Sequence, residues 1–474
     1  MISVQNLWHC FLPLFASEYL RMKIVILGAG RRGIRLAKHL IQEKKSVVLV
    51  DSNPTRCQQV VSKLDCMTVC GSATDLEILK EAGAAEAGAV IAVTDSDEVN
   101  LVACGIAASN FSKATTIAAI RSISYLGSSK GSGKRILGID HIVNPEEEAA
   151  KRMTSVLKSG LFSDIIDFDD ANFILFRILL SSSSPFVGKT LIDMKKSLSG
   201  EYIIIGLRRG SEVLTPSGNT VLNEGDEIAV MAGDDDSENV YKALRGDNSN
   251  VKLRRMITVG GTRIARYLFS NLTRGMLKRM TLIEKDADIC REFSEEFPQI
   301  LTINESITDE NIWEDERLSQ ADLMISVTEN DELNIITASY AKRTGTKKTM
   351  ALLKTNPNYI QFATNMDIDA TISTTESTVD AIMKFLRGEN VVTLHSIFSG
   401  ELEVYEYVLG ERFSLLGKKL MEVDLRGKCI IAGVKRSRSN ESFVPNGQYE
   451  FTVGDTVLVA CAHRSYDAVT ELFR

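Results

Sequence analysis

Residues 23–33 read K-I-V-I-L-G-A-G-R-R-G, and this stretch decides the fold of the first half of the chain. Its first five residues predict a buried strand, and the apolar spacing from Arg31 to Gln42 predicts a helix directly after the glycines. Gly28 permits a tight turn, Gly30 lets a pyrophosphate approach the backbone, and Gly33 lets the helix lie close to the strand. The stretch therefore indicates a dinucleotide-binding turn in a doubly wound α/β sheet.

The next predicted strand, residues 47–50, ends at an acid. Asp51 follows Gly28 by 23 residues, close to the spacing of about 20 expected for the acid that holds the adenosine ribose hydroxyls. Its negative charge would repel a 2'-phosphate, which favours NAD over NADP. A G-x-G-x-x-G motif also arises by chance as a packing motif. The strand before it, the helix after it and the acid together favour nucleotide binding.

Further apolar runs continue the alternation of strands and helices. They predict three more strands, at residues 67–70, 90–93 and 116–120. Near-continuous apolar runs are typical of parallel strands that are covered on both faces. We therefore predict that the first module is a Rossmann-like, doubly wound parallel sheet.

The same series of elements is written twice along the chain. V-T-D-S-D-E-V-N at residues 93–100 returns as V-T-E-N-D-E-L-N at residues 327–334. Matching positions keep the register: Gly28 with Gly260, Asp51 with Glu284, and residues 185–191 with residues 414–420. Self-similarity of this kind indicates a duplicated unit, in which a larger α/β module precedes a smaller one.

The smaller modules are predicted to be rich in strands, which in the first copy lie at residues 173–180, 202–207 and 227–231. V-G-K-T at residues 187–190 is no P-loop, because position 183 is serine where that motif requires glycine. Gly188 and Gly417 are expected to be turn residues, and the acidic run at residues 234–236 is expected to form a solvated loop.

The second copy changes the glycine turn. It reads G-G-T-R-I-A at residues 260–265, so Thr262 and Ala265 stand where the first copy has glycines, while Glu284 preserves the acid. A side chain at the middle position obstructs the approach of a phosphate to the backbone. We predict that the second turn binds nucleotide weakly, differently or not at all. The alternative is that Thr262 turns away and Ala265 is small enough.

The repeated segment at residues 93–100 has two interpretations. It follows the fourth predicted strand and therefore lies at the carboxyl edge of the sheet, where ligands of such sheets bind. Asp95 with Glu98 also fits a capping box, and acids in a first helical turn favour the positive end of the helix dipole. Structure alone explains the acids as well as ligand contact does. Thr94 and Asp95 are the better candidates for touching a nucleotide.

Composition excludes several classes of function. The net charge of -7 argues against nucleic acid as a partner, and the eight cysteines include no C-x-x-C pair, so no metal site is expected. The apolar start, residues 7–16, is too short to span a bilayer and lacks a basic leading region, so residues 1–21 are expected to be an N-terminal extension. The five histidines occur singly, and His141 is expected to be structural rather than catalytic.

Five stretches of the first half read M-K-I-V-I-L-G-A-G, L-V-D-S-N, G-S-A-T-D-L-E-I-L-K-E-A-G-A, A-V-T-D-S-D-E-V-N-L-V-A-C and G-I-D-H-I-V-N-P-E. Together they resemble the TrkA family, the cytosolic regulatory subunits of bacterial Trk potassium uptake systems. The resemblance extends through almost the whole chain from Met22 and includes A-K-R-T-G-T-K-K-T-M-A-L-L in the second half.

This resemblance implies two RCK units in tandem. Each is a Rossmann-like RCK N-terminal domain, a crossover helix and a small α+β RCK C-terminal domain. The expected ranges are 22–143, 144–165 and 166–246 in the first half, and 252–370, 371–390 and 391–474 in the second. Asn144 and Pro145 are expected to start the first crossover helix as its cap and first residue. The apolar stripes of the two crossover helices are expected at Ala149, Met153, Val156 and Leu157, and at Thr378, Ala381, Ile382 and Phe385.

The resemblance also implies a function, which is nucleotide-sensing regulation of a membrane potassium-uptake system rather than catalysis. The expected ligand is NAD(H), or ATP or ADP, and the expected partner is a TrkH-like membrane subunit beneath which the chains assemble as a tetrameric ring or a dimer of dimers. The protein would then be cytoplasmic and peripheral on the inner face of the membrane. The alternative is an NAD-dependent oxidoreductase. The expected cofactor-binding residues are Gly28, Ala29, Gly30, Arg31, Arg32, Gly33, Asp51, Gly71, Ser72, Ala73, Thr94, Asp95, Arg121 and Glu284.

Overall fold

A computed structural model describes residues 22–42, 45–122, 135–159, 165–168, 171–210, 212–246, 253–309, 311–354, 359, 362–363, 366–387, 394–398, 401–411, 413–425, 428–439, 441–462, 469 and 472. The expected N-terminal extension lies outside these residues. The chain forms two compact units: one holds residues up to Lys151 with residues 353–358 and 372–386, and the other holds the remainder. In the ranges given above, no helix has both the length and the apolar character needed to cross a bilayer.

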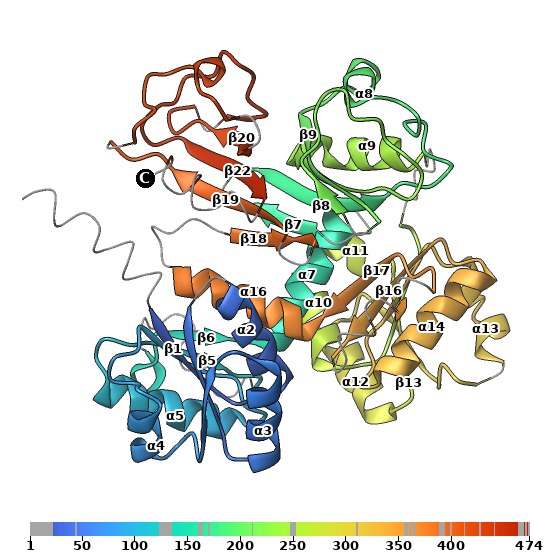
Figure 1. The fold of residues 1–474 in the computed structure, drawn as a ribbon. Coiled ribbons are helices and arrows are strands. Elements are labelled where there is room, and N and C mark those ends of the chain that lie inside the picture. The colour runs from blue at the N-terminus through green and yellow to red at the C-terminus, as the bar shows by residue number, and fades with distance from the viewer. Residues whose placement is uncertain are drawn as a thin grey trace, which may run out of the picture. The chain divides into compact units, whose positions relative to one another are not determined.

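The first unit is built on a six-stranded sheet in the order β3-β2-β1-β4-β5-β6, and all of its ladders are parallel. Its strands are β1 (Lys23–Leu27), β2 (Ser46–Asp51), β3 (Met67–Cys70), β4 (Ala89–Ala92), β5 (Thr115–Ala119) and β6 (His141–Val143). Its helices include α2 (Arg31–Gln42), α3 (Pro54–Lys63), α4 (Leu76–Glu81) and α5 (Asp97–Asn110). The strand order reverses between β1 and β4, which confirms the predicted doubly wound fold (Figure 1).

A helix from the second half covers one face of this sheet. In α16 (Thr374–Arg387), the apolar side chains of Val379, Ile382, Met383 and Leu386 join the core formed by β1, β2, β4 and α2. At the start of the helix, Glu376 pairs with Arg35 of α2 at 2.7 Å. The predicted stripe was close to this face, since Ile382 lies in the core and Phe385 stacks on His141 with ring centroids 4.3 Å apart. The stacking is consistent with a structural role for His141, which begins β6 and whose pKa burial lowers.

The second unit repeats the large sheet in the order β14-β13-β12-β15-β16-β17. The strands are β12 (Met256–Val259), β13 (Met280–Glu284), β14 (Leu301–Asn304), β15 (Leu323–Ser326), β16 (Lys348–Leu353) and β17 (Ala370–Ser373). The helices between them are α10 (Arg263–Asn271), α11 (Arg274–Leu277), α12 (Ala287–Glu296), α13 (Ile312–Asp315) and α14 (Asp331–Thr344). Position by position this order matches the first sheet, which confirms the duplication.

Two five-stranded antiparallel sheets form the small modules, in the orders β10-β9-β11-β8-β7 and β18-β19-β22-β20-β21. The first contains β7 (Ile165–Phe168), β8 (Phe173–Leu179), β9 (Tyr202–Arg209), β10 (Glu212–Leu214) and β11 (Glu227–Gly233), with α8 (Leu191–Ser197) and α9 (Asp234–Arg245). The second contains β18 (Leu394–Ile397), β19 (Leu402–Val408), β20 (Cys429–Lys435), β21 (Ser442–Phe443) and β22 (Thr456–Ala462). The predicted β-rich character of these modules is confirmed.

The acidic run Asp234, Asp235 and Asp236 was wrongly predicted to be a loop. These residues form the first turn of α9. Carboxylates at this end of a helix lie near the partial positive charge of the backbone dipole, so the run favours helix formation there. Asp236 also accepts a hydrogen bond from the backbone N–H of Glu201 at 2.8 Å, which ties the helix start to β9.

The first crossover helix, α7 (Pro145–Ser159), begins where the sequence predicts. The side-chain oxygen of Asn144 accepts hydrogen bonds from the backbone N–H groups of Glu146 and Glu147, at 3.0 and 3.1 Å. All four residues of its predicted apolar stripe are buried: Ala149, Met153, Val156 and Leu157. The domain boundaries taken from the sequence stay a prediction.

The two small modules share one hydrophobic core within the second unit, and their contacts are reciprocal. A Cβ added to Gly433 of β20 would approach the ring of Phe173 in β8 to 2.7 Å, and one added to Gly206 of β9 would approach Leu402 of β19 to 2.5 Å. Gly206 and Gly433 occupy matching positions in the two copies, and so do Phe173 and Leu402. The two modules therefore pack as a pseudo-twofold pair, like the two copies in a homodimer.

We predict that Gly433→Ala destabilises the protein by about 1–3 kcal/mol, because the added methyl group overpacks the core against the buried ring of Phe173. The measurement is urea unfolding of the full chain. Gly410→Ala is the matched control, because a Cβ there has no atom within 4 Å and its cost should stay within about 0.5 kcal/mol. Equal stabilities for the two variants would contradict tight packing between the modules.

Candidate functional site

The first unit contains a cavity of about 440 Å³ at the carboxyl ends of β1 and β4. This is the point at which the strand order reverses, and open α/β sheets bind their ligands there. Five of the predicted site residues line the cavity: Ala29, Gly30, Arg31, Arg32 and Asp95. The remaining lining residues are Ile34, Arg56, Gln59, Val93, Lys354 and Thr375.

The three glycines of the turn have different physical roles. Gly28 has φ +107°, and a Cβ there would press on the backbone of Thr94 at 3.0 Å. A Cβ on Gly33 would lie 1.8 Å from the carbonyl oxygen of Gly28, so only glycine allows α2 to approach the strand this closely. A Cβ on Gly30 would meet no atom within 4 Å. The space in front of Gly30 is therefore open, and it belongs to the cavity.

Helix α2 begins directly after Gly30, at the floor of the cavity. Because glycine has no side chain, the residue before the helix cannot accept a hydrogen bond from the first-turn N–H groups. Such orphan N–H groups, together with the helix dipole, bind phosphates and other anions. The turn therefore offers an anion site with room above it.

Asp51 is buried at the end of β2 and holds the turn in place. Its carboxylate accepts hydrogen bonds from the backbone N–H groups of Ala29 and Asn53, both at 2.8 Å. The guanidinium of Arg56, in the first turn of α3, lies 3.7 Å from the same carboxylate and 4.0 Å from that of Asp95. Asp51 thus links the turn to the cavity wall, where Arg56 supplies positive charge.

Arg32 carries a second positive charge into the cavity. Burial lowers the pKa of its guanidinium and the nearby Arg121 lowers it further, while Asp95, Asp97 and Glu146 act in the opposite direction. An arginine remains protonated at neutral pH despite such a shift. A partly desolvated guanidinium is a strong donor to phosphate, because little of its hydration has to be removed on binding.

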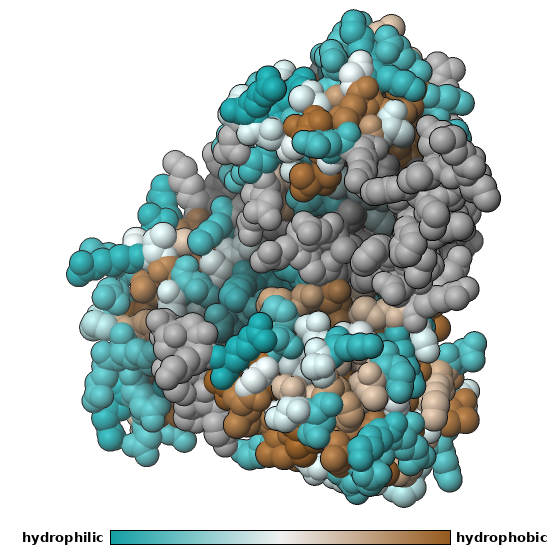
Figure 2. All heavy atoms as spheres, turned by 90° about the vertical axis from the view of Figure 1, so that its left-hand side faces the viewer, coloured by the Kyte–Doolittle hydropathy of each residue, from teal (hydrophilic) through white to brown (hydrophobic). Residues whose placement is uncertain are grey.

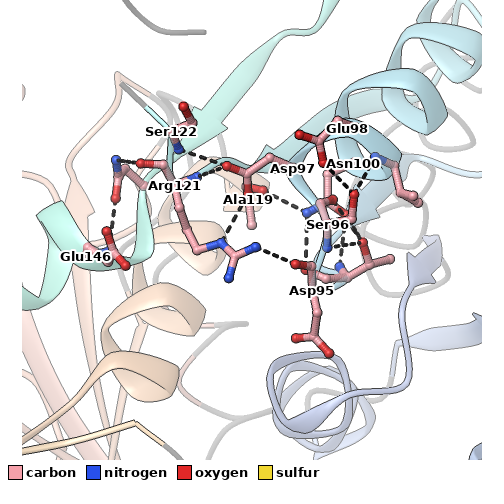
Figure 3. Close-up of polar contacts among 12 residues, drawn as sticks. Asp95, Ser96, Asp97, Glu98, Asn100, Ala119, Arg121, Ser122 and Glu146 are labelled. Carbon is pink, nitrogen blue, oxygen red and sulfur yellow. Dashed lines mark hydrogen bonds and ion pairs between the residues drawn. The ribbon is translucent and has the colours of Figure 1, made fainter. Parts of the chain in front are cut away.

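The repeated segment has a mainly structural role (Figure 3). Ser96, not Asp95, caps α5, since its hydroxyl accepts the N–H of Val99 at 3.2 Å. The predicted capping box at Asp95 is therefore wrong by one position. Ser96 also donates its hydroxyl hydrogen bond to Glu98 at 2.7 Å. The side chain of Asp95 is 77% exposed and lies at the cavity instead.

Asn100 explains why the segment recurs. Its side-chain oxygen accepts hydrogen bonds from the N–H and hydroxyl of Thr94, at 2.9 and 2.7 Å, and its amide donates to the carbonyl oxygen of Ala119 at 2.8 Å (Figure 3). In the second copy, Asn334 makes the same bonds to Thr328 and Leu352. The asparagine therefore joins neighbouring strand ends in both sheets.

Several predicted site residues lie close to the cavity but do not line it. Asp97 accepts hydrogen bonds from the backbone N–H of Arg121 at 3.0 Å and from its side chain at 3.2 Å, while the Arg121 guanidinium also donates to the carbonyl oxygen of Asp95. Thr94 is held by Asn100. The backbone N–H of Gly71 donates to the carbonyl oxygen of Asp51 at 3.0 Å. The residues outside the lining set are Gly28, Gly33, Asp51, Gly71, Ser72, Ala73, Thr94, Arg121 and Glu284.

In the second unit, side chains of the protein fill the equivalent crevice. Thr262 caps α10 by accepting the N–H of Ala265 at 3.4 Å and donates its hydroxyl to the carbonyl oxygen of Val327 at 3.0 Å. Glu284 accepts the N–H of Gly261 at 2.6 Å, and a Cβ on Gly261 would lie 2.5 Å from Ile289. The helix start that is open in the first unit is thus capped and covered in the second. Weak, altered or absent nucleotide binding here stays a prediction.

Four lining residues were missed by sequence reasoning: Arg56, Gln59, Lys354 and Thr375. Arg56 and Gln59 lie on α3, one turn apart, directly after the acid. A helix that begins with N-P at Asn53 points this face back towards the glycine turn, so the repeat of basic and amide residues was the available signal. Lys354 and Thr375 come from the second half, and no local pattern could have indicated them.

Comparisons with known proteins agree with this architecture. The TrkA-N domain matches residues 24–145 and 256–374, and the TrkA-C domain matches residues 175–245 and 404–474. The Trk system potassium uptake protein TrkA of Halomonas elongata is 28% identical over 92% of this chain and 95% of that protein. Two solved structures share the fold with a TM-score of 0.55: the GsuK RCK domain, at 17% identity over 95% of both chains, and the GsuK channel bound to NAD, at 16% identity over 98% of this chain and 84% of that chain.

We predict that Asn100→Ala destabilises the protein by about 1–3 kcal/mol, because it leaves the N–H of Thr94 and the carbonyl oxygen of Ala119 without their buried partner. Urea unfolding of the full chain measures the change. Asn110→Ala, on the same helix, is the control, since its amide bond to the carbonyl oxygen of Ile106 is exposed and should contribute under about 0.5 kcal/mol. A fully stable Asn100→Ala protein would refute the structural role assigned to the repeated segment.

Proposed function

The chain belongs to the TrkA family and is a regulatory subunit of a potassium transport system, and we propose that it regulates by sensing an adenine nucleotide in the cavity beside Gly30. One observation carries the proposal: the open start of α2 faces the same cavity as the guanidinium groups of Arg31, Arg32 and Arg56. Backbone N–H groups and arginines that converge on one space are suited to phosphates.

The turn also suits the rest of a dinucleotide. A pyrophosphate at the N-terminus of α2 would place the attached adenosine ribose near Asp51, which accepts hydrogen bonds and has no basic group that would favour a 2'-phosphate on its own strand. We therefore propose NAD(H) as the ligand, the nucleotide named for the GsuK channel of similar fold. The cationic lining would accommodate ATP or ADP in the same cavity.

The proposed role is regulation rather than catalysis. Hydride transfer needs a substrate site and a group that can donate or accept a proton near the nicotinamide. The cavity lining within the described ranges includes no histidine, cysteine, tyrosine or lysine–carboxylate pair that would serve as such a group. The alternative, an NAD-dependent oxidoreductase, has no observation in its favour.

A ligand can shift the arrangement of the modules only if it binds two arrangements with different affinity. Helix α2, whose first turn would hold the phosphates, pairs through Arg35 with Glu376 of α16 at 2.7 Å. Because α16 precedes the second small module in the chain, this pairing offers a direct link between the ligand and the second half. We propose that the link passes the nucleotide state on to a TrkH-like membrane subunit at the inner face of the membrane.

Assembly into a homo-oligomer is proposed from repeated apolar surface. Val102 on α5 and Ile336 on α14 occupy the same place in the duplicated sequence, and both are exposed, Ile336 to 60%. Leu137 lies beside the first position, and the exposed Tyr340 follows one turn after the second. Figure 2 shows apolar side chains of this kind on the surface among polar ones. Exposed apolar groups at equivalent positions of both copies suit a symmetric ring of tetramer or dimer-of-dimers type.

We predict that Asp51→Ala and Gly30→Trp each abolish the effect of nucleotide on potassium uptake. Asp51→Ala removes the acid that holds the turn and the ribose, and Gly30→Trp fills the open space above α2. Nucleotide affinity, measured by calorimetry on the full chain, should fall at least tenfold in both variants. Potassium uptake in cells that express the variant with its membrane partner gives the functional readout.

Glu284→Ala is the control for this experiment, because it alters the equivalent acid in the second unit. Retained nucleotide response in both Asp51→Ala and Gly30→Trp would remove the proposed site. Turnover of NAD(H) with a small-molecule substrate by the purified chain would instead favour the oxidoreductase.

We predict that Ile336→Glu, or the paired change Val102→Glu, lowers the oligomeric state of the purified chain, because a buried carboxylate in an apolar interface is costly. Light scattering after size-exclusion chromatography measures the mass. Ser109→Glu, on the exposed part of α5, should leave the mass unchanged. If all three variants keep the mass of the unaltered chain, the two helix faces do not form the assembly surface.

A further inference from the structure

Two residues of the second half line the nucleotide cavity of the first. Lys354 lies just after β16, and Thr375 is the second residue of α16. Both belong to the same compact unit as the first sheet. The cavity wall is therefore made by residues that are far apart in the sequence, and it is complete only when both halves of the chain are present.

The position of Lys354 in the repeat explains how it came to be basic. Asn100 bonds the carbonyl oxygen of Ala119, and Asn334 bonds that of Leu352, so these two strand positions are equivalent. Arg121 and Lys354 each lie two residues further along. Arg121 pairs with Asp97 of its own sheet at 3.2 Å, whereas Lys354 lines the cavity above Gly30.

The cavity carries a surplus of positive charge. Arg31, Arg32, Arg56 and Lys354 line it, and Asp95 is the one carboxylate among the residues that the described lining includes. A pyrophosphate alone would not neutralise four cations. The lining therefore suits a ligand with more negative charge than a dinucleotide pyrophosphate carries, such as the phosphate chain of a nucleoside di- or triphosphate.

The N-terminal end of α16 adds to this field. Thr375 places the first turn of this 14-residue helix at the cavity, and Glu376, the next residue, is turned to Arg35 and is half-buried. The starts of α2 and α16 thus face one space from the two halves of the chain. Partial positive charge at the start of each helix attracts an anion placed between them.

Resting on the function proposed above, we propose that the second half completes the nucleotide site of the first, with Lys354 and the start of α16 binding the outer phosphates of a nucleoside di- or triphosphate. A longer phosphate chain then bridges α2 and α16, whereas a ligand with one phosphate reaches α2 alone. The site reads the number of phosphates, and the contact with α16 reports it to the second half.

The same residues cannot serve a second, equivalent site in the other unit. There the position of Arg32 is taken by Ile264 and that of Arg56 by Ile289, both apolar, and Thr262 caps the helix start. Ile264 is fully buried in the core of its own sheet. The two halves have therefore divided the work: one keeps the turn that holds a nucleotide, and the other provides a cation and a helix start to it.

The test is calorimetric titration of ATP, ADP and AMP into the full chain and its Lys354→Ala variant. Lys354→Ala should weaken ATP and ADP by about tenfold or more, the effect of losing one charge-assisted contact to phosphate, and AMP by no more than about threefold. Lys354→Arg should restore most of the ATP affinity. Lys113→Ala, an exposed lysine in the turn before β5, is the matched control and should leave all three affinities unchanged.

A second variant, Thr375→Trp, fills the cavity from the side of α16 and should reduce the affinity for ATP more than that for AMP. Thermal unfolding of each variant checks that it folds. Equal weakening of ATP, ADP and AMP by Lys354→Ala, or no weakening of any, overturns this inference while leaving the proposed function in place. Failure of the unaltered chain to bind any of the nucleotides would instead remove the proposed function.

Discussion

The structure depends on how the backbone N–H groups after the first strand of each large sheet find hydrogen-bond acceptors. In both copies an acid at the end of the second strand accepts the N–H inside the glycine turn: Asp51 from Ala29 and Glu284 from Gly261. The copies differ at the helix that follows. In the second copy Thr262 caps the helix, while in the first Gly30 leaves its first turn to be satisfied by solvent or a ligand. One residue thus decides whether the turn is closed by the protein or open to an anion.

This constraint makes the duplication informative. Both copies keep everything that builds the sheet, including the asparagine that joins neighbouring strand ends and the acid that holds the turn. They differ where a ligand would lie, since Arg56 of the first copy is replaced by Ile289, which packs over Gly261. Positions needed for folding and positions suited to binding are therefore separated by the comparison of one half with the other, within a single chain.

Sequence reasoning succeeded wherever the signal was local. Apolar runs of four or five residues marked the parallel strands, and the glycine turn with its acid marked the cavity floor, because both depend on neighbours in sequence. It failed by one residue at Ser96, whose hydroxyl rather than the Asp95 carboxylate reaches the N–H of Val99. It also failed at Asp234, because a run of acids resembles a solvated loop although it stabilises the start of α9.

The rest of the site could not be predicted, because it is made by tertiary contact between the halves. The apolar stripe of α16 is equally compatible with its own sheet and with another, and only packing shows that Val379 and Ile382 complete the core of the first sheet. That packing brings Thr375 to the cavity and Glu376 to Arg35. A duplicated chain whose halves were independent would bind two ligands without coupling. An exchanged helix instead makes the environment of one ligand depend on both halves, and a binding free energy that depends on their contact is what couples a nucleotide to a change in arrangement.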